Sequence, residues 1–405
     1  MKMTWTMLLS VAGLLSVEAA VPQVSNVTIA KDARSRKVTI SYDLDLPAIV
    51  TAEILVDGKT LDCPKVFAGE VNRLVKADTG KKIYWQGDID WPLQSAAKLG
   101  ARVTAWTLDV PPDYMAVKLF DDDVDAKCWY YASTNDIPGG VGDRRYKSDW
   151  LLMRRVPAKG VHWRMGNDST RTIAGPGSQT HLVSFTNDYY IGVYEITVAQ
   201  YRRIGGKSYG AFFLDYADSD YFPMTSVYYK DDGHLRGNVS PKSDVASNSA
   251  MQKLRTLTGI GTFDLPTDAQ WEFACRAGTA TTLNDGTDTA WTGAGVENMK
   301  RIAWCTKNSD GHPHEVGLKP PNAWGLYDML GNVSEWVRDS EHAYTAEDDD
   351  IDPIWADTSK YWRRGGAFSH DGWDVNSGSR NFSHGGWGND KNNWTGFRVM
   401  CRVGE

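Results

Sequence analysis

The hydrophobic pattern changes along this chain, and the change constrains its fold more than any other feature. Apolar and polar residues alternate with a period of two through much of residues 22–110, in stretches such as KVTISYDLDL and AIVTAEILVDGKT. This period is typical of half-buried strands, and Asp57-Gly58 is a hairpin turn signal between two of them. We therefore predict a small all-β sandwich, fibronectin type III-like in size, over residues 21–112.

Paired prolines mark the end of this first region. They stand in DVPPDYM, and the following residues are first acidic (FDDDVDAKCWYYAS) and then glycine-rich (IPGGVGDRRYK). Proline stiffens a chain and lacks a backbone donor, so a domain boundary is expected here. We interpret residues 113–154 as a connector that packs on the next domain. Its acidic run is interpreted as a solvated loop, with cation binding as the alternative.

The first twenty residues have the features of a secretory signal peptide. Lys2 precedes an apolar run from Thr4 to Val17, which is too short to span a bilayer, and Ala19 and Ala20 supply small residues for cleavage. A buried N-terminal helix is the alternative. No later segment is apolar enough for a membrane span. The sequence therefore predicts an exported protein that is periplasmic, cell-surface or secreted, with residues 1–20 as the signal peptide.

The charge and the aromatic content of the chain indicate which kinds of molecule it can bind. The 405 residues carry 44 Lys and Arg against 51 Asp and Glu, a net charge of -7, and no long basic run occurs. A nucleic-acid partner is therefore not expected. The 17 tryptophans are many for this length, and outside a core tryptophan often serves as a flat contact surface. We expect an unknown protein or glycan as the ligand.

From about residue 151 the pattern becomes mixed α and β. YYIGVYEIT is typical of a strand, and VAQYRRIGG of a short helix that ends at paired glycines. NSAMQKLRTLTG has the pattern of an amphipathic helix that ends at Gly259. In LPTDAQWEFACRAG, Thr267 and Gln270 form a capping box, which predicts a helix that starts there and closes at Gly278.

Six motifs in this second region resemble the formylglycine-generating enzyme family, or sulfatase-modifying factor domains. They follow the family's order over about residues 155–403 and read WRMGN, YIGVYEITVAQYRRI, LPTDAQWEFACRAGT, PNAWGLYDMLGNVSEWVRD, RRGGAFS and TGFRV. The resemblance implies an α+β, C-type-lectin-like fold over residues 155–405, held by glycine turns and buried tryptophans. Trp271, Trp324 and Trp336 lie inside the motifs and are expected in the core.

The resemblance also implies a chemistry for which this chain lacks residues. Family members that oxidise a sulfatase cysteine carry two cysteines shortly after RGG, which bind Cu(I) because soft thiolates select it. Residues 365–400 contain no cysteine, and His370 stands near the place of the first. We therefore expect no catalytic cofactor. The alternative is a metal-dependent oxidase of the formylglycine-generating or sulfoxide-synthase type, acting on a cysteine or thiol substrate.

Two cysteines are expected to pair on the basis of the resemblance. Related members tie the helix after WEFA to the strand after GFRV, which implies a Cys275–Cys401 disulfide. Such a long closed loop would stabilise the fold by about 3–5 kcal/mol in the chain-entropy model. Cys63–Cys128 is a second pairing, which would leave Cys305 free.

The GNVSEW motif is a candidate metal site by the same resemblance. Asn332 and Glu335 would supply oxygen ligands to a structural Ca²⁺, an ion that prefers hard oxygen donors. The alternative is that both side chains satisfy the turn by hydrogen bonds.

The stretch GAFSHDGWDVNSGSRNFSHGGWGNDKNNWTGFRV, residues 366–399, is the candidate binding surface. It is rich in Asn, Gly, Ser, Asp and His, all of which arise from an asparagine codon by changes at its adenines alone, whereas Trp does not. The stretch is therefore similar to the variable regions of diversity-generating retroelements, some of which resemble this fold and vary at this place. Small polar residues with fixed aromatic residues are also the mixture of antibody loops.

We therefore predict an exported ligand-binding protein whose contact surface lies in this stretch. An ordinary Gly/Asn-rich loop is one alternative, and catalysis by His370 with Asp371 or Asp374 is another. The predicted contact residues are Ser369, His370, Asp371, Trp373, Asp374, Asn376, Asn381, His384, Trp387, Asn389 and Asn393.

Overall fold

The structure is a computed structural model, which describes residues 20–404 except 63–65, 93–97, 121–126, 168–178, 208–218, 231–232, 291–292, 343, 347, 358–359, 373 and 383–392. The predicted signal peptide up to residue 19 therefore lies outside the described residues. So do Cys63 and four of the predicted contacts, Trp373, His384, Trp387 and Asn389. No described helix combines the length and the apolar character that a bilayer crossing requires.

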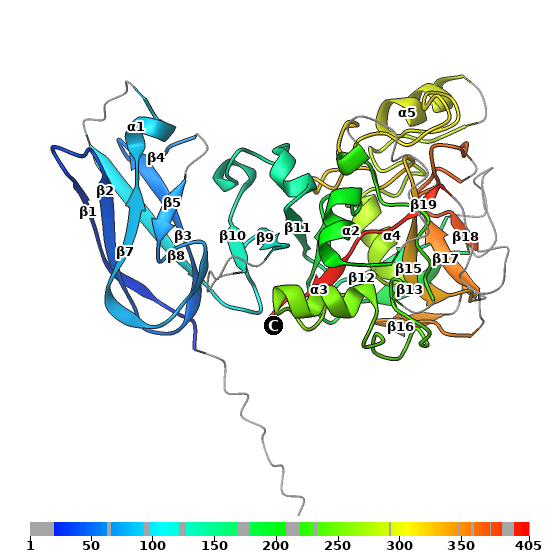
Figure 1. The fold of residues 1–405 in the computed structure, drawn as a ribbon, viewed down its shortest axis with the longest axis horizontal. Helices are drawn as coiled ribbons and strands as arrows, with labels where there is room; N and C mark the ends of the chain where they lie inside the picture. Colours follow the sequence, from blue (N-terminus) through cyan, green and yellow to red (C-terminus); the bar gives the residue numbers. More distant parts are fainter. Residues whose placement is uncertain are drawn as a thin grey trace, which may run out of the picture.

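The N-terminal region is an all-β sandwich, as predicted (Figure 1). Its first sheet has the order β1-β2-β7-β5, with bounds Val24–Lys31, Val38–Leu44, Asp78–Trp85 and Phe67–Gly69. Its second sheet has the order β4-β3-β6, with β8 paired to β3, and bounds Lys59–Thr60, Ala48–Val56, Arg73–Val75 and Leu99–Trp106. A short helix, α1 (Gly87–Asp90), follows β7. Along β2 alternate residues are buried, which is the period-two pattern that the sequence predicted.

The segment predicted as a connector instead supplies two complete strands and most of a third to the next sheet. That sheet has the order β10-β9-β11-β14-β20, with bounds Cys128–Tyr131, Tyr114–Lys118, Trp150–Val156, Tyr189–Gly192 and Met400–Arg402. All five residues of β9 are buried between its two neighbours, so the stretch YMAVK is a core strand. Much of the stretch from 113 to 154 is therefore integral to the second folded unit, because its backbone completes that unit's sheet.

The rest of the second region is mixed α and β around two smaller sheets. One has the order β12-β13-β16, with bounds His162–Met165, His181–Ser184 and Asp349–Ile351. The other has the order β18-β17-β15-β19, with bounds Arg380–Phe382, Tyr361–Arg364, Ser334–Ser340 and Thr395–Gly396. The longer helices are α2 (Val198–Ile204), α3 (Ala250–Thr258), α4 (Asp268–Arg276) and α5 (Ala294–Ile302). The fold class is therefore α+β preceded by a small all-β sandwich, as predicted.

The helix boundaries confirm the predictions from local sequence. Thr267 caps α4, and both hydrogen bonds of its capping box with Gln270 are present. The C-cap of α4 is Ala277, one residue before the predicted Gly278, and it takes the left-handed conformation. Gly205 and Gly259 end α2 and α3 as left-handed C-caps.

The predicted Cys275–Cys401 disulfide is wrong, and the strand geometry gives the reason. Cys275 is a free cysteine whose Sγ lies 3.6 Å from Ser377 Oγ. Met400 packs in the same core cluster as Cys275, whereas Cys401 packs in the other large cluster. Successive residues of a strand point to opposite faces, so β20 directs Cys401 away from α4. The second pairing is not formed by a described partner either, since Cys128 is a free cysteine and Cys63 lies outside the described residues.

Candidate ligand-binding site

The loop that carries most of the predicted contacts, residues 365–379, connects β17 to β18. These strands are antiparallel, and Arg364 at the end of β17 lies opposite Arg380 at the start of β18. The loop therefore leaves and re-enters the fold at a single point of the sheet. The partners of these two arginines therefore fix the position of the loop.

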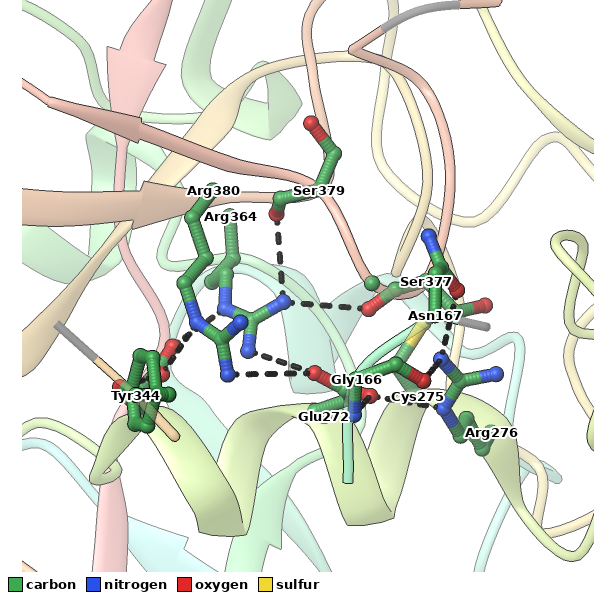
Figure 2. Close-up of polar contacts among 12 residues, drawn as sticks. Gly166, Asn167, Glu272, Cys275, Arg276, Tyr344, Arg364, Ser377, Ser379 and Arg380 are labelled. Atoms are coloured by element: carbon green, nitrogen blue, oxygen red, sulfur yellow. Dashed lines mark hydrogen bonds and ion pairs between the residues drawn. The ribbon is translucent and has the colours of Figure 1, made fainter. Parts of the chain in front are cut away.

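A carboxylate of helix α4 holds both arginines (Figure 2). Arg380 Nε donates to Asp268 Oδ2 at 2.7 Å, and Arg364 Nε donates to Asp268 Oδ1. Arg364 also donates to Glu272 Oε2 at 2.7 Å, one helical turn further along α4. Tyr344 Oη donates to Asp268 Oδ2 at 2.7 Å. These side chains are fully buried, so the ends of the loop are fixed by charge-assisted hydrogen bonds out of contact with water.

The same network reaches the second half of the loop from beneath (Figure 2). Arg364 Nη1 donates to the backbone carbonyls of Ser377 and Ser379, each at 3.2 Å. Arg276 donates to Glu272 Oε1 at 2.9 Å and to Asn167 Oδ1 at 3.0 Å. The stretch before β18 therefore packs against a buried polar network of α4, formed by Asp268, Glu272 and Arg276 with Arg364.

Neighbouring charges set the ionisation state of the two carboxylates in this network, Asp268 and Glu272. Burial alone would raise the pKa of Asp268, but the guanidinium groups of Arg364 and Arg380 outweigh burial and hold that pKa well below its usual range. Burial is likewise outweighed at Glu272, where Arg276 and Arg364 lower the pKa to about 2. Both groups therefore stay ionised across the physiological range, and three arginines compensate their charge.

Several predicted contact residues lie together on the outer side of this loop. Ser369 is exposed, and His370, Asp374 and Asn381 are part-exposed. Asn381 Nδ2 donates to Asp374 Oδ1 at 2.8 Å, which joins the first residues of β18 to the loop. Asp371 and Asn393 are also part-exposed. The described part of the predicted surface thus offers carboxylate, amide, hydroxyl and imidazole groups within one short segment.

Asn376 is a correction to the predicted set. Its side chain is fully buried, and its Oδ1 accepts hydrogen bonds from Asn167 Nδ2 and from the backbone N–H of Gly378, both at 3.1 Å. The close approach explains this burial, because a Cβ on Gly378 would lie 2.4 Å from the Asn167 side chain. Asn376 therefore fixes the loop to β12's neighbouring turn and cannot contact a ligand at the surface.

His370 does not form a catalytic pair with Asp374 in this arrangement. The distance from His370 Nδ1 to the nearer Asp374 oxygen is 3.9 Å, which exceeds a hydrogen bond. His370 Nδ1 has no hydrogen-bond partner among the described residues. Burial lowers the pKa of His370, although Asp374 opposes the shift, so the imidazole is neutral at pH 7. A neutral imidazole has one N–H donor and one acceptor nitrogen, and here the Nδ1 atom is buried.

The predicted calcium ligands, Asn332 and Glu335, are used within the fold. Arg398 Nη2 and Trp271 Nε1 donate to the two carboxylate oxygens of Glu335, each at 2.7 Å. Asn332 Oδ1 accepts from the His314 backbone, and its amide nitrogen donates to Glu195 at 2.6 Å. Calcium needs several oxygens directed at one point. The side-chain oxygens of both residues instead face cationic or N–H donors, so the pair does not fit a calcium ion.

The network that positions the loop was missed in the sequence, although a signal for it is present. Asp268, Glu272 and Arg276 stand four residues apart and therefore share one face of α4. A charged stripe on a short helix is normally interpreted as the solvent side. Here the neighbouring Trp271, Ala274 and Cys275 are also buried, so the charged residues of α4 do not lie on a solvent-exposed face.

Comparison with known proteins identifies the class of domain that this fold and loop define. Residues 155–403 match the family described as "Sulfatase-modifying factor enzyme 1-like domain", which is more than half of the chain. The chain belongs to this family. The resemblance drawn from the six sequence motifs is therefore confirmed, together with the C-type-lectin-like fold that it implied.

Curated relatives match only in part. "Chaperone protein LppX" of Paenibacillus barcinonensis is 25% identical over 182 residues, which is 37% of this chain and 61% of that protein. The formylglycine-generating enzyme of Mycobacterium tuberculosis is 39% identical over 78 residues, 18% of this chain and 26% of that enzyme. The corresponding enzyme of Mus musculus is 36% identical over 80 residues, 18% of this chain and 22% of that enzyme. The chain thus spans less than two thirds of the length of these relatives.

Solved structures with a similar chain trace include Treponema denticola variable protein 1. Its TM-score is 0.48 at 22% identity, covering 67% of this chain and 97% of that one. PvdO from Pseudomonas aeruginosa has a TM-score of 0.45 at 23% identity, covering 62% of this chain and 95% of that one.

Proposed function

We propose that this protein is an exported, non-catalytic binding protein that presents the loop 365–379 and the residues after it to a protein or glycan ligand. The observation that carries the proposal is the anchoring of this polar loop at both ends. Arg364 and Arg380 are fixed on Asp268, while Ser369 and His370 remain accessible above them. A recognition surface needs variable polar groups on a scaffold that does not move, because a preorganised loop loses less entropy on binding.

The composition of the segment supports recognition over catalysis. Asn, Ser, Asp and His side chains adapt their hydrogen bonds to different ligands, and tryptophans supply rigid contact area at low entropic cost. Trp394, at the end of the segment, lies with its ring centroid 6.1 Å from that of His370. This pairing of an aromatic ring with polar groups is the mixture that binding loops use. The pattern of adenine-accessible residue types supports a diversified receptor as the particular kind of binding protein.

The competing function is a metal-dependent oxidase, and the missing thiolates weigh against it. Residues 365–400 contain no cysteine, whereas the copper chemistry of the family depends on two in this part of the chain. His370 alone would be one neutral nitrogen ligand. Among curated relatives, one is named a chaperone, which supports a polypeptide as the first ligand class to test.

Two measurements test the proposal. The purified protein is titrated with Cu(I) and with Fe(II), and oxygen uptake is followed with a thiol donor. We expect no tight metal binding and no thiol-dependent oxygen uptake. Stoichiometric metal binding with thiol-dependent oxygen uptake would overturn the proposal in favour of the oxidase.

The second measurement concerns the gene. The locus is sequenced in many cells, and its surroundings are searched for a near-copy of codons 365–398. A near-copy that differs only at adenines, beside a reverse transcriptase, is expected for a diversified receptor. An invariant segment without a near-copy would remove the diversification and leave a binding protein of fixed specificity.

A further inference from the structure

A cavity lies where the sandwich meets the five-stranded sheet. Its volume is about 510 Å³, and it is lined by β5 and its neighbours on one side and by β10 and β11 on the other. Figure 1 shows this junction on the opposite side of the second domain from β18, which borders the loop 365–379. The backbone N–H of Tyr130 donates to the Asn72 carbonyl at 2.7 Å across the junction. The two walls of the cavity are therefore held together by direct contacts.

Aromatic rings form one wall of this cavity. Trp129 and Trp150 lie with their ring centroids 4.7 Å apart, and both are part-exposed. Tyr131 and Tyr146 line the same wall, and Phe67 of β5 faces it from the sandwich. Part-exposed aromatic rings around one hollow offer flat apolar surface to a ligand.

The charged side chains of the cavity are cations. Arg73, Lys118 and Arg145 line it, and no carboxylate does so among the described residues. Lys118 Nζ lies 5.4 Å from the ring of Trp129 and 5.7 Å from that of Trp150. Arg145 is paired with Asp143 at 3.0 Å. Arg73 has no ion-pair partner among the described residues, so its charge is available to a ligand.

A groove next to the cavity, on the other side of Arg73, is also lined by basic residues. This groove has a volume of about 410 Å³ and shares Arg73 with the cavity. Lys76, Lys81 and Lys127 also line it, against Glu70 as the one carboxylate among its described lining residues. Lys81 is paired with Glu70 at 2.8 Å, and cations outnumber carboxylates among the described lining residues of the groove. In a chain whose net charge is -7, the described lining of this junction carries a net positive charge.

We infer that this junction is a second binding site, independent of the loop 365–379, and that it binds an anionic glycan. A sugar ring presents an apolar C–H face that stacks on an aromatic ring, here Trp129 or Trp150. Carboxylates or sulfates on the ring edge then pair with Arg73, whose planar guanidinium suits such groups. An acidic peptide would satisfy the cations but would leave the aromatic wall without a matching flat surface.

The test is calorimetric titration of the full chain with four probes. The probes are tetragalacturonate, a heparin-derived sulfated tetrasaccharide, neutral cellotetraose and an octaglutamate peptide. We expect at least one of the two anionic saccharides to bind, more weakly at high salt, and the other two probes to give no signal. Carboxylate and sulfate recognition are told apart by which saccharide binds. Absence of binding by both saccharides, or equal binding of octaglutamate, would overturn the inference.

Four variants locate the binding on the structure. Arg73→Gln and Trp129→Phe are expected to weaken saccharide binding at least tenfold and about threefold, respectively. Arg34→Gln is the matched control, because Arg34 is exposed beyond β1 at the sheet edge opposite β5. His370→Ala should leave saccharide affinity unchanged, which separates this site from the proposed loop surface. An affinity that survives Arg73→Gln, or that is lost in His370→Ala, would place the glycan elsewhere and refute the inference.

Discussion

Arg364 and Arg380 lie opposite each other on β17 and β18 and share the carboxylate of Asp268. The two buried guanidinium groups would repel each other without that carboxylate and the carboxylate of Glu272. The relationship has a geometrical consequence, because the chain between the two arginines is closed at its base. The candidate binding loop is therefore fixed by residues that no ligand touches.

Removal of the shared charge should loosen the loop and the whole domain. Asp268→Asn leaves two buried guanidinium groups with one carboxylate fewer, and breaking such a network costs about 3–5 kcal/mol. Urea unfolding should show this loss in the free energy of unfolding. The matched control is Asp220→Asn, because Asp220 is exposed and pairs with Arg202 at the surface. A loss below about 1 kcal/mol at Asp268 would mean that the buried network does not anchor the loop.

The same carboxylate predicts that this part of the fold loses stability in acid. The folded pKa of Asp268 is held well below that of the unfolded chain, so its stabilisation is present above the unfolded pKa. It decreases progressively as the pH falls below the unfolded pKa towards the folded value, so part of it is already lost at pH 3. We expect the free energy of unfolding to fall less between pH 7 and pH 3 in Asp268→Asn than in the wild type. Unfolding at both pH values measures this. An identical pH dependence in the variant and the wild type would contradict this.

Asp328 should act in the opposite direction. Burial raises the pKa of Asp328 to about 6, so the folded state holds this proton more tightly than the unfolded chain. Stability from this group is therefore present at low pH and is lost as the pH rises through about 6. Asn at this position keeps an acceptor for the Gly317 N–H, which lies 2.6 Å from Oδ2, and tolerates the φ of 52°.

We therefore expect Asp328→Asn to be more stable than the wild type at pH 8, by about 1–3 kcal/mol, and equally stable near pH 4. Urea denaturation across this range measures both values. A variant that is less stable at pH 8 would mean that the attraction of Asp328 to Arg398 and Lys147 exceeds the cost of its burial.

Cys275 should be a protected thiol rather than half of a disulfide. Burial raises its pKa to about 12, so the thiolate that reacts with alkylating reagents is scarce in the folded protein. We expect no alkylation of Cys275 in the native state and complete alkylation after unfolding without a reductant. Peptide mass spectrometry distinguishes these states. Recovery of a peptide pair that joins Cys275 to Cys401 would show that the disulfide forms after all.

His370 should be dispensable for folding. Its Nδ1 has no partner among the described residues, so His370→Ala breaks no hydrogen bond from that atom. We expect the free energy of unfolding to change by less than about 1 kcal/mol, measured in urea. Asn376→Ala is the contrasting variant in the same loop, because its buried Oδ1 accepts two hydrogen bonds, and it should cost more. A larger loss at His370 than at Asn376 would place His370 in the core rather than at a binding surface.

The sequence by itself determined the features that depend on neighbouring residues. The capping box of Thr267 and Gln270 closes within four residues, and the left-handed caps at Gly205 and Gly259 need only a residue without a Cβ. The strands of the sandwich could likewise be predicted, because a period of two reports burial on one face. The family followed from motifs whose order is a property of the sequence.

The tertiary structure alone decided which distant residues meet. Asp268 binds Arg364 and Arg380 across 96 and 112 residues, and nothing in the local pattern of α4 distinguishes a buried charged stripe from a solvated one. The face of β20 on which the Cys401 side chain lies depends in the same way on packing, and so does the burial of Asn376. β9 became a core strand only because β10 and β11 pair with it. Burial and charge pairing are properties of the assembled sheet and helices, and the candidate site consists of such contacts.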